Sequence, residues 1–260
     1  MSETEKLKSI SKEVADFYNR VHQVITFPDN SVQSYRAIDI AETYEDIILD
    51  SSVSDGMKVL DSGCGLGAFA AYLAQKKNCD VTAITFSETE FATAQKTYGD
   101  KSTKGNLHYQ QADFHFMKNI FQKETFDMVM FLESFEHVYD KEKVLRDAFD
   151  ILKPGGFLFI KYHFVLWKNA TGREDAFKKT LQSETDSMRI FTHLALHEYI
   201  KLCESIGFQL KLIKLPSINT DDYRSSNANV EVANSAIKNF NFTVPDFPVT
   251  QCYNTLLQKL

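Results

Sequence analysis

The sequence predicts a doubly wound α/β fold, and three observations carry that prediction. From Lys58 onward, short apolar runs alternate with stretches of helical spacing, which is typical of successive βαβ units. Runs such as Met128–Phe131 are apolar on both faces, as central parallel strands are. A glycine-rich turn, residues 63–67, follows the first expected strand where a helix should begin. We therefore expect a parallel sheet with helices on both faces.

The expected elements alternate regularly up to about residue 165. The helix over residues 141–152 is the best marked, because Asp140 can cap its first amides and an apolar stripe runs through it. The sequence Pro-Gly-Gly at 154–156 should end this helix and turn the chain into the next strand. The expected strands are residues 58–61, 80–86, 107–111, 126–131 and 156–164, and the helices between them are residues 68–77, 88–98, 114–121 and 141–152.

The segments that flank this alternation are less regular. Residues 1–55 have apolar positions at helical spacing on both sides of Pro28, which predicts two or three helices. Residues 217–249 are polar and irregular. Beyond residue 165 we expect an insertion over 168–190, a helix over 194–205, a strand over 208–215, a helix near 230–239 and a last strand over 252–257.

The composition disfavours several classes of protein. Of the 260 residues, 29 are basic and 35 acidic, and the net charge of −6 disfavours a general nucleic-acid binder, because phosphate polymers attract basic surfaces. No apolar run approaches the ~20 residues that span a bilayer, and the polar N-terminus lacks the core of a signal peptide. The four cysteines lie far apart, so we expect neither a disulfide framework nor a metal site. We expect a cytoplasmic location for the same reason. Lys118, Lys123, Lys141 and Lys143 are interleaved with acids and are expected on solvated faces.

The turn at residues 63–67 is the strongest candidate for a binding loop. Small residues let a ligand approach the backbone, and the start of the following helix offers free amides. Dinucleotide-binding loops have the spacing GxGxxG, with an acidic residue about 20 positions further on. Here the spacing is GxGxG, and Asp61 stands two residues before the first glycine. A structural turn without a ligand is the other interpretation.

Together with four later features, this loop resembles that of class I S-adenosylmethionine-dependent methyltransferases. The resemblance covers residues 57–165 and is less specific up to residue 260. It implies a Rossmann-like, seven-stranded sheet whose last strand is antiparallel, and S-adenosyl-L-methionine as co-substrate. The four features are the second strand at 81–86, the sequence QADF at 111–114, the strand beginning FDMV at 126–129, and LKPGG at 152–156.

The same resemblance implies a division of the chain. Residues 1–55 would form an N-terminal helical cap, and residues 56–260 a Rossmann-like methyltransferase domain. Elements at about residues 166–190 and 217–249 would form a lid that selects the acceptor.

The resemblance also implies roles for residues at the ends of the strands. The methionine part of the cofactor would pass close to the backbone at Gly63 and Gly65, in a loop ordered by Asp61. Asp113 would accept a hydrogen bond from the adenine amino group, and Phe114 would pack beside the ring. The implied cofactor-binding residues are Asp61, Ser62, Gly63, Cys64, Gly65, Thr85, Phe86, Glu90, Asp113, Phe114 and Leu132.

The end of the second strand departs from the commonest family pattern, in which an acidic residue holds both ribose hydroxyls. Thr85 occupies that place, as in a subgroup that includes cyclopropane fatty-acid synthases and several isoprenoid and natural-product methyltransferases. In that subgroup a Gln five positions later also reaches the ribose, and here Glu90 stands there. Thr85 and Glu90 would share this role, unless Glu90 is a solvated acid of the first helical turn.

Three titratable side chains, Glu133, Glu136 and His137, follow the fourth strand, where a base would stand beside the transferred methyl group. This segment resembles that of small-molecule methyltransferases, including tocopherol-type enzymes. His137 would be the general base for an oxygen or nitrogen acceptor. Glu133 would take a proton or stabilise a cation during carbon methylation. Alternatively, Glu136 and His137 only hydrogen-bond the loop, and Glu133 is structural.

The leading hypothesis is methylation, on carbon or oxygen, of a small hydrophobic metabolite of natural-product or isoprenoid type. Methylation of RNA or protein and a catalytically silent cofactor-binding protein are the alternatives. We expect no nucleic-acid partner, no membrane partner and no metal, and the sequence allows a homo-oligomer. Aromatic side chains that flank the expected acceptor opening favour a lipophilic acceptor: Tyr18, Phe27, Tyr35, Phe135, Tyr162, His163, Phe164, Trp167 and Phe191.

Overall fold

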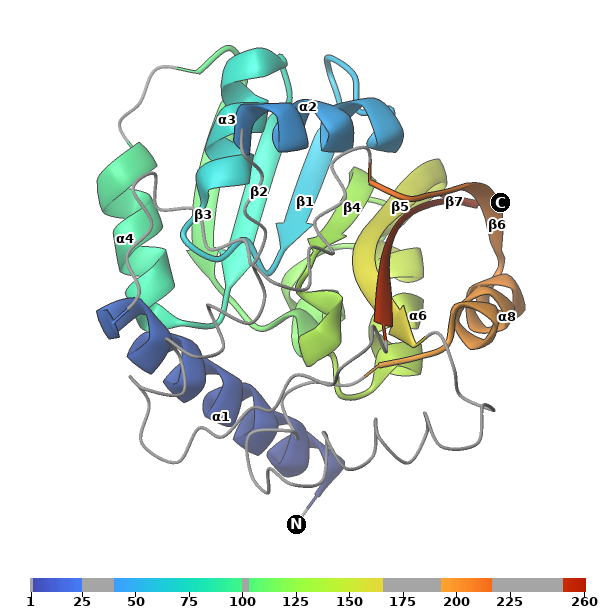
Figure 1. Cartoon of the computed structure of the whole chain (residues 1–260), viewed down its shortest axis with the longest axis horizontal. Helices are drawn as coiled ribbons and strands as arrows, with labels where there is room; N and C mark the ends of the chain where they lie inside the picture. The colour runs from blue at the N-terminus through green and yellow to red at the C-terminus, as the bar shows by residue number, and fades with distance from the viewer. Residues whose placement is uncertain (1, 25–39, 100–102, 166–192, 217–249) are drawn as a thin grey trace.

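The computed structural model describes residues 2–24, 40–99, 103–165, 193–216 and 250–260. Within these ranges the chain forms one sheet with helices on both faces, as Figure 1 shows. This confirms the predicted doubly wound, Rossmann-like α/β fold. The predicted lid elements at 166–190 and 217–249, and the helix expected near 230–239, lie outside the described residues.

The sheet has seven strands in the order β3-β2-β1-β4-β5-β7-β6. Strands β1 to β5 pair in parallel, whereas β7 is antiparallel to both β5 and β6, which confirms the expected antiparallel last strand. The central strands β1 and β4 are almost entirely buried, because helices cover both faces. The strands are β1 Lys58–Ser62, β2 Asp80–Thr85, β3 Asn106–Gln111, β4 Phe126–Leu132, β5 Leu152–Val165, β6 Phe208–Lys214 and β7 Thr250–Lys259.

Helices divide between the two faces of the sheet. One buried cluster joins α2, α3 and α4 to the sheet, and a second joins α5, α6 and α8 to the opposite face. The helix expected over 114–121 is split into a 3₁₀ turn, η1, and a single-turn helix, α5, because Phe116 leaves the helical conformation. The helices are α1 Glu3–Val24, α2 Ile40–Ser51, α3 Ala68–Lys76, α4 Glu88–Tyr98, η1 Phe114–Phe116, α5 Met117–Ile120, η2 Phe135–His137, α6 Lys141–Ile151 and α8 Leu196–Ile206.

The turn after α6 differs from its prediction. Asp140 caps α6 as expected, since its carboxylate accepts a hydrogen bond of 2.9 Å from the Lys143 amide. However, β5 already begins at Leu152, which pairs with Phe126, so the helix passes directly into the strand. The Pro-Gly-Gly sequence lies inside β5, in an irregularity that shifts the register with β4 and in which Gly155 has a φ of +76°.

The two N-terminal helices have different neighbours. In Figure 1, α1 crosses the edge of the sheet where the parallel strands end. Its apolar stripe of Leu7, Ile10, Val14 and Phe17 is buried, as expected of an amphipathic helix. Helix α2 instead packs on α3 and β7. The division of the chain into a cap of residues 1–55 and a domain of residues 56–260 stays a prediction.

Candidate active site

The loops that carry the predicted site residues are fixed to one another at the carboxyl edge of the sheet. The backbone amides of Gly63 and Cys64 both donate to the Ile84 carbonyl at 2.9 Å, which joins the turn after β1 to β2. The Ser134 hydroxyl donates to the Ser62 carbonyl at 2.5 Å, which joins the turn after β4 to β1. The structure therefore brings the glycine turn and the turn after β4 side by side.

Protein neighbours alone already require glycine in the turn after β1. Gly63 has a φ of +86°, and a Cβ atom there would lie 2.4 Å from the Cβ of Ser134. Gly67 has a φ of +84°, and its Cβ would lie 2.6 Å from the ring of Tyr109, whose hydroxyl donates to the Gly67 carbonyl at 2.7 Å. Gly65, with a φ of +54°, completes the left-handed positions of the turn. Side chains here would displace neighbouring loops whether or not a ligand is bound.

Asp61, the fourth residue of β1, presents a buried carboxylate to this turn. Asp61 is only 2% exposed, and its Oδ1 has no hydrogen-bond partner among the described residues. Burial raises the pKa of Asp61 to about 7. A buried acceptor without a donor is costly in the folded protein, so this carboxylate fits a site that a ligand's donor groups complete.

Thr85 and Glu90 form a pair at the end of β2. The Thr85 hydroxyl donates to the Glu90 carboxylate at 2.5 Å, and Ser87, which caps α4, accepts from the Glu90 amide at 3.1 Å. Glu90 is only 6% exposed, so it is not the solvated helix acid of the alternative interpretation. The shared role that the subgroup resemblance implies for this pair stays a prediction. Phe86 lies beside them, partly buried against the neighbouring core.

Asp113 follows β3 and holds the η1 turn. Its carboxylate accepts hydrogen bonds from the His115 amide at 2.9 Å and from the His115 Nδ1 at 2.8 Å. Burial acts to raise the pKa of Asp113, but these contacts with His115 outweigh it and leave that pKa below its ordinary value. Phe114 is 1% exposed and packs edge-on against Phe86, 3.6 Å from where a Cβ of Gly63 would stand. These residues therefore lie on the same edge as the glycine turn.

A buried ion pair follows β4. Leu132 ends the strand, and Glu133 adopts a φ of +56°, a left-handed conformation that is uncommon for residues other than glycine. The Glu133 carboxylate lies 2.6 Å from the Lys161 ammonium, with side-chain exposures of 9% and 1%. Sequence reasoning missed Lys161, although a single lysine within the most apolar stretch of the chain was a signal for it.

The other two predicted catalytic side chains point to different elements. The Glu136 carboxylate accepts a hydrogen bond of 3.2 Å from the His163 amide on β5, and burial raises the pKa of Glu136 to about 7. His137 shares a hydrogen bond of 2.7 Å between its Nε2 and the hydroxyl of Tyr18 on α1. The three side chains after β4 therefore lie in one turn but contact three separate partners.

Lys141, expected on a solvated face, is instead buried in the first turn of α6. Its ammonium group donates to the carbonyls of Phe135 and Val138, at 2.8 and 2.9 Å, and closes the η2 turn. Burial lowers the pKa of Lys141 to about 7. The prediction was wrong because acidic neighbours in sequence do not show which way a helix faces.

Helix α1 also makes polar side-chain contacts with the loops at the carboxyl edge of the sheet. Besides Tyr18, its Ser11 hydroxyl lies 3.2 Å from the Nδ1 of His115, next to Asp113. Asn19 accepts a hydrogen bond of 2.6 Å from the hydroxyl of Ser87, the residue that caps α4. The helix is thus attached by side chains to the loops after β2, β3 and β4.

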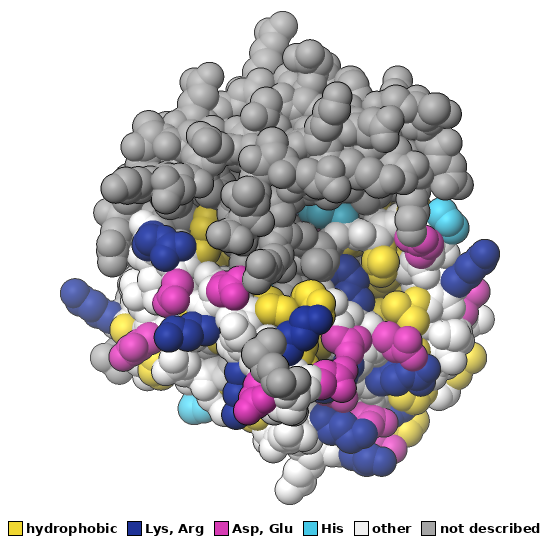
Figure 2. All heavy atoms as spheres, turned by 90° about the horizontal axis from the view of Figure 1, so that it is seen from below, with side chains coloured by type: hydrophobic (Ala, Val, Ile, Leu, Met, Phe, Trp, Pro, Cys, Tyr) yellow, Lys and Arg dark blue, Asp and Glu magenta, His cyan; other side chains and the backbone are white. Residues whose placement is uncertain are grey.

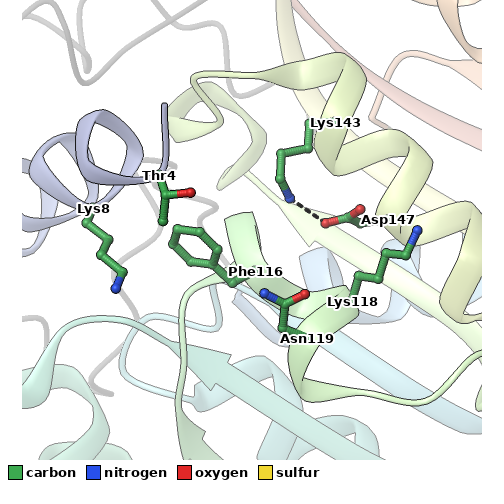
Figure 3. Close-up of a pocket in the computed structure, with 7 residues that line it drawn as sticks. All are labelled: Thr4, Lys8, Phe116, Lys118, Asn119, Lys143 and Asp147. Carbon is green, nitrogen blue, oxygen red and sulfur yellow. Dashed lines mark hydrogen bonds and ion pairs between the residues drawn. The ribbon is translucent and has the colours of Figure 1, made fainter. Parts of the chain in front are cut away.

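A groove of about 450 Å³ lies beside these loops, between α1 and the α5–α6 layer. Figure 3 shows Lys143 on one wall, paired with Asp147 at 2.6 Å. Lys143 also donates to the His115 carbonyl at 2.5 Å, so this wall supports the η1 turn. None of the predicted cofactor or catalytic residues lines the groove. Its lining residues are Thr4, Lys8, Phe116, Lys118, Asn119, Lys143 and Asp147.

Several aromatic residues expected around the acceptor belong to the core instead. Phe135, Tyr162 and Phe164 are fully buried, with Tyr162 edge-on to both other rings. Tyr18 remains partly exposed beside His137. The predicted residues Phe27, Tyr35, Trp167 and Phe191 lie outside the part of the chain that the structure describes.

The described residues show neither a metal-binding cluster nor a membrane-spanning helix. Within the described ranges, no three His, Cys, Asp or Glu side chains are grouped so as to hold a metal ion. No described helix is both long and apolar enough to cross a bilayer.

The sheet order, the antiparallel β7 and the glycine turn after β1 define the class I methyltransferase fold. Residues 60–160 match a protein family described as a methyltransferase domain. This match confirms, for that part of the chain, the resemblance to S-adenosylmethionine-dependent methyltransferases noted in the sequence.

Several known proteins are similar to this chain in sequence or in fold. Methyltransferase GfsG of Streptomyces halstedii is 31% identical over 170 residues, which are 61% of this chain and 60% of that protein. The chloroplastic tocopherol O-methyltransferase of Arabidopsis thaliana is 26% identical over 229 residues, 78% of this chain and 64% of that protein. The matched region thus spans less than two thirds of either relative. The crystal structure of the [4+2]-cyclase SpnF shares the fold, with a TM-score of 0.72, 15% identity and 96% coverage of both chains.

Proposed function

We propose that this protein transfers the methyl group of S-adenosylmethionine to a small, hydrophobic metabolite, on carbon or oxygen. One juxtaposition carries the proposal. A glycine turn with a buried carboxylate, whose Oδ1 lacks a hydrogen-bond partner among the described residues, lies against the turn that holds Glu133, Glu136 and His137. The first feature suits a ligand that brings its own donors, and the second suits the handling of a proton beside it.

The cofactor would lie along the carboxyl ends of β1, β2 and β3. Asp61 would accept a hydrogen bond from a donor of its methionine part, which would supply the partner that its Oδ1 lacks among the described residues. Thr85 and Glu90 would hold the ribose hydroxyls, and Asp113 the adenine amino group. The remaining residues of the proposed cofactor site are Ser62, Gly63, Cys64, Gly65, Phe86, Phe114 and Leu132.

The chemistry requires orientation before it requires a covalent helper. Once bound, the cofactor supplies an electrophilic methyl group, and the protein must align the acceptor atom with it. His137 would receive the proton that an oxygen acceptor loses. Glu133, paired with Lys161, and Glu136 would offset positive charge that develops beside the turn.

The proposed acceptor class rests on the relatives and on the surface charge. The relatives' names include a tocopherol O-methyltransferase, whose named acceptor is a lipophilic small molecule. Figure 2 shows the molecule from below the view of Figure 1. Over the described part of this face, Lys or Arg side chains are interleaved with Asp or Glu side chains. Such a mixture does not favour a phosphate polymer. We therefore propose no nucleic-acid partner. We also propose a cytoplasmic location, which the four separated cysteines favour, and a homo-oligomer is compatible with this proposal.

The test is incubation with methyl-labelled S-adenosylmethionine and a fractionated extract of the native organism. Label in the organic phase is expected, and mass spectrometry of that phase would then identify the acceptor. Asp61→Asn should weaken cofactor binding in calorimetry, while Asp80→Asn, at an exposed ion pair with Lys58, should not. Label confined to RNA or protein would replace the small-molecule acceptor with a macromolecule. Cofactor binding without transfer to any fraction would indicate a silent binding protein.

A further inference from the structure

One side chain of α1 reaches the titratable turn after β4. The hydroxyl of Tyr18 lies 2.7 Å from the Nε2 of His137, and the two rings meet edge to face with centroids 5.2 Å apart. The His137 amide is itself bonded to the Ser134 carbonyl at 3.1 Å, so η2 fixes the histidine backbone. A short hydrogen bond therefore occupies the ring nitrogen that a base would use.

The two members of this pair differ in exposure. His137 is 6% exposed, whereas Tyr18 is partly exposed. A molecule that approaches the imidazole nitrogen must displace the Tyr18 hydroxyl or meet it first. Displacement would break a short hydrogen bond, whereas contact with the hydroxyl keeps it.

The protonation state of the phenol decides whether Tyr18 can donate a hydrogen bond. Burial raises the pKa of Tyr18 far above its usual range, and the negative charges of Glu90, Glu136 and Glu133 add to this effect. The phenol therefore stays protonated and is able to donate a hydrogen bond. In the proposed relay it donates to Nε2 of His137, which requires that the proton of the imidazole lie on Nδ1. These acids follow both β2 and β4, so the hydroxyl stands between the cofactor loops and the acidic turn.

We propose that Tyr18 is a further catalytic residue, which contacts the acceptor hydroxyl and relays its proton to His137. This inference rests on the proposed methyl transfer and narrows it to an oxygen acceptor. The acceptor O–H bond breaks and its proton passes to the Tyr18 oxygen, while the Tyr18 proton passes to Nε2 of His137. The acceptor oxygen forms a bond to the methyl carbon as the carbon–sulfur bond breaks. The products are the methyl ether, the neutral thioether and an imidazolium.

Tyr18→Phe tests the relay, because it removes only the hydroxyl and keeps the ring that packs on His137. Tyr72→Phe is the matched control, since Tyr72 is also partly exposed. Its hydroxyl donates a hydrogen bond of 2.6 Å to the carboxylate of Glu45, which lies on α2. We expect Tyr18→Phe to lower the rate of label transfer about 100-fold, a typical acid–base contribution, with cofactor affinity within about twofold of the wild type. Tyr72→Phe should change neither quantity.

Combination with His137→Gln separates a relay from a packing role. Residues that act as one unit are not additive, so the double variant should be no slower than His137→Gln alone. Additive losses, or a Tyr18→Phe protein that transfers label at the wild-type rate while His137→Gln is slow, would overturn the relay.

Nitrogen-15 NMR of histidine-labelled protein supplies a readout that needs no acceptor. The wild-type protein should show His137 protonated on Nδ1, with an Nε2 resonance that moves in Tyr18→Phe and stays in place in Tyr72→Phe. A wild-type Nε2 that carries the proton would overturn the relay, whether or not label is transferred. If the wild-type protein transfers label to no fraction, it is the proposed function that fails.

Discussion

The carboxyl edge of the sheet has two halves that are built in different ways. The proposed cofactor half, the loops after β1, β2 and β3, contains pairs that are close in sequence, such as Thr85 with Glu90 and Asp113 with His115, beside distant contacts such as that of Tyr109 with Gly67. The acceptor half, the turn after β4 with β5 and α1, is assembled from distant partners. Tyr18 and His137 are 119 residues apart. Local sequence therefore predicts some side-chain pairs of the first half, whereas the contact between Tyr18 and His137 forms only once the chain has folded.

The halves also treat buried charge differently. In the cofactor half, Asp61 keeps an oxygen with no hydrogen-bond partner among the described residues. In the acceptor half, the Glu133 carboxylate is paired with Lys161 at 2.6 Å. A carboxylate that awaits a donor suits the binding of a cationic cofactor. The ion pair of Glu133 and Lys161 suits a site for the proposed apolar acceptor, because each of these two charges compensates the other.

The largest expected effect comes from removing the base of the acceptor half. His137→Ala should lower the rate of label transfer by about 10²–10⁴, the usual contribution of general base catalysis, and leave cofactor affinity nearly unchanged. Single-turnover assays and calorimetry measure the two quantities. The exposed His108 on β3 offers the control, because His108→Ala should leave both unchanged. A fully active His137→Ala protein would shift the role to Glu133 or to orientation alone.

The buried ion pair should show a large effect on stability. Lys161→Met leaves Glu133 buried without its cation, which should lower the free energy of unfolding by about 3–5 kcal/mol in urea titrations. Adding Glu133→Leu should restore most of that loss. The partly exposed pair of Lys153 and Asp127, at 2.7 Å, provides the contrast, and Lys153→Met should cost about 0–1 kcal/mol. Equal losses at both lysines would contradict the distinction between a buried and a partly exposed ion pair.

In the proposed cofactor half, the buried carboxylate of Asp61 should lower the stability of the unliganded protein while it favours cofactor binding. The folded pKa of about 7 lies above the unfolded value of about 4, so the fold binds this proton more tightly. The cost of the buried Asp61 carboxylate to the unliganded protein should therefore decrease as the pH falls from about 8 toward 4, and the difference from Asp61→Asn isolates it. Asp61→Asn should be more stable than the wild type by about 1–3 kcal/mol at pH 8, and this gain should vanish near pH 4. A gain independent of pH would contradict the assignment.

The smallest expected effect concerns the ribose pair. Thr85→Val removes the donor to Glu90 and should weaken cofactor binding by about 0.5–1.5 kcal/mol, which is up to about tenfold in Kd. Thr125→Val is the control, since the Thr125 hydroxyl donates at 2.8 Å to the Gln122 carbonyl, in the turn before β4 and away from the cofactor loops. Calorimetric titration with S-adenosylhomocysteine would measure both variants. Indistinguishable affinities would remove Thr85 from the proposed cofactor site.

Much of the fold was predictable from the sequence because its signals are local. Apolar runs placed β1 to β4 to within one or two residues, and Asp140 marked the start of α6. The start of β5 was wrong, since Pro-Gly-Gly is a strong turn signal that here sits inside a strand. Pairing of Leu152 with Phe126 overrode the local preference, and only the neighbouring strand could show that.

The positions of the candidate site residues were predictable from the sequence, but their distant partners were not. The glycine turn, Thr85, Asp113 and the acidic turn after β4 stand in recognisable positions, and the structure brings them to one edge. Tyr18 and Lys161 were not identified as partners. Their contacts depend on how α1 crosses the sheet and on the register of β5 against β4.

By itself, therefore, the sequence determined the α/β alternation, the strand that carries the glycine turn and the residue types available after β4. Periodicity and turn chemistry encode these features over a few residues, so they can be read without a fold. Only the tertiary structure decided which charges are buried and which partners they meet. Burial and pairing depend on strands and helices that are distant in sequence, and the free energy of a carboxylate such as Asp61 or Glu133 is set by those neighbours rather than by its own segment.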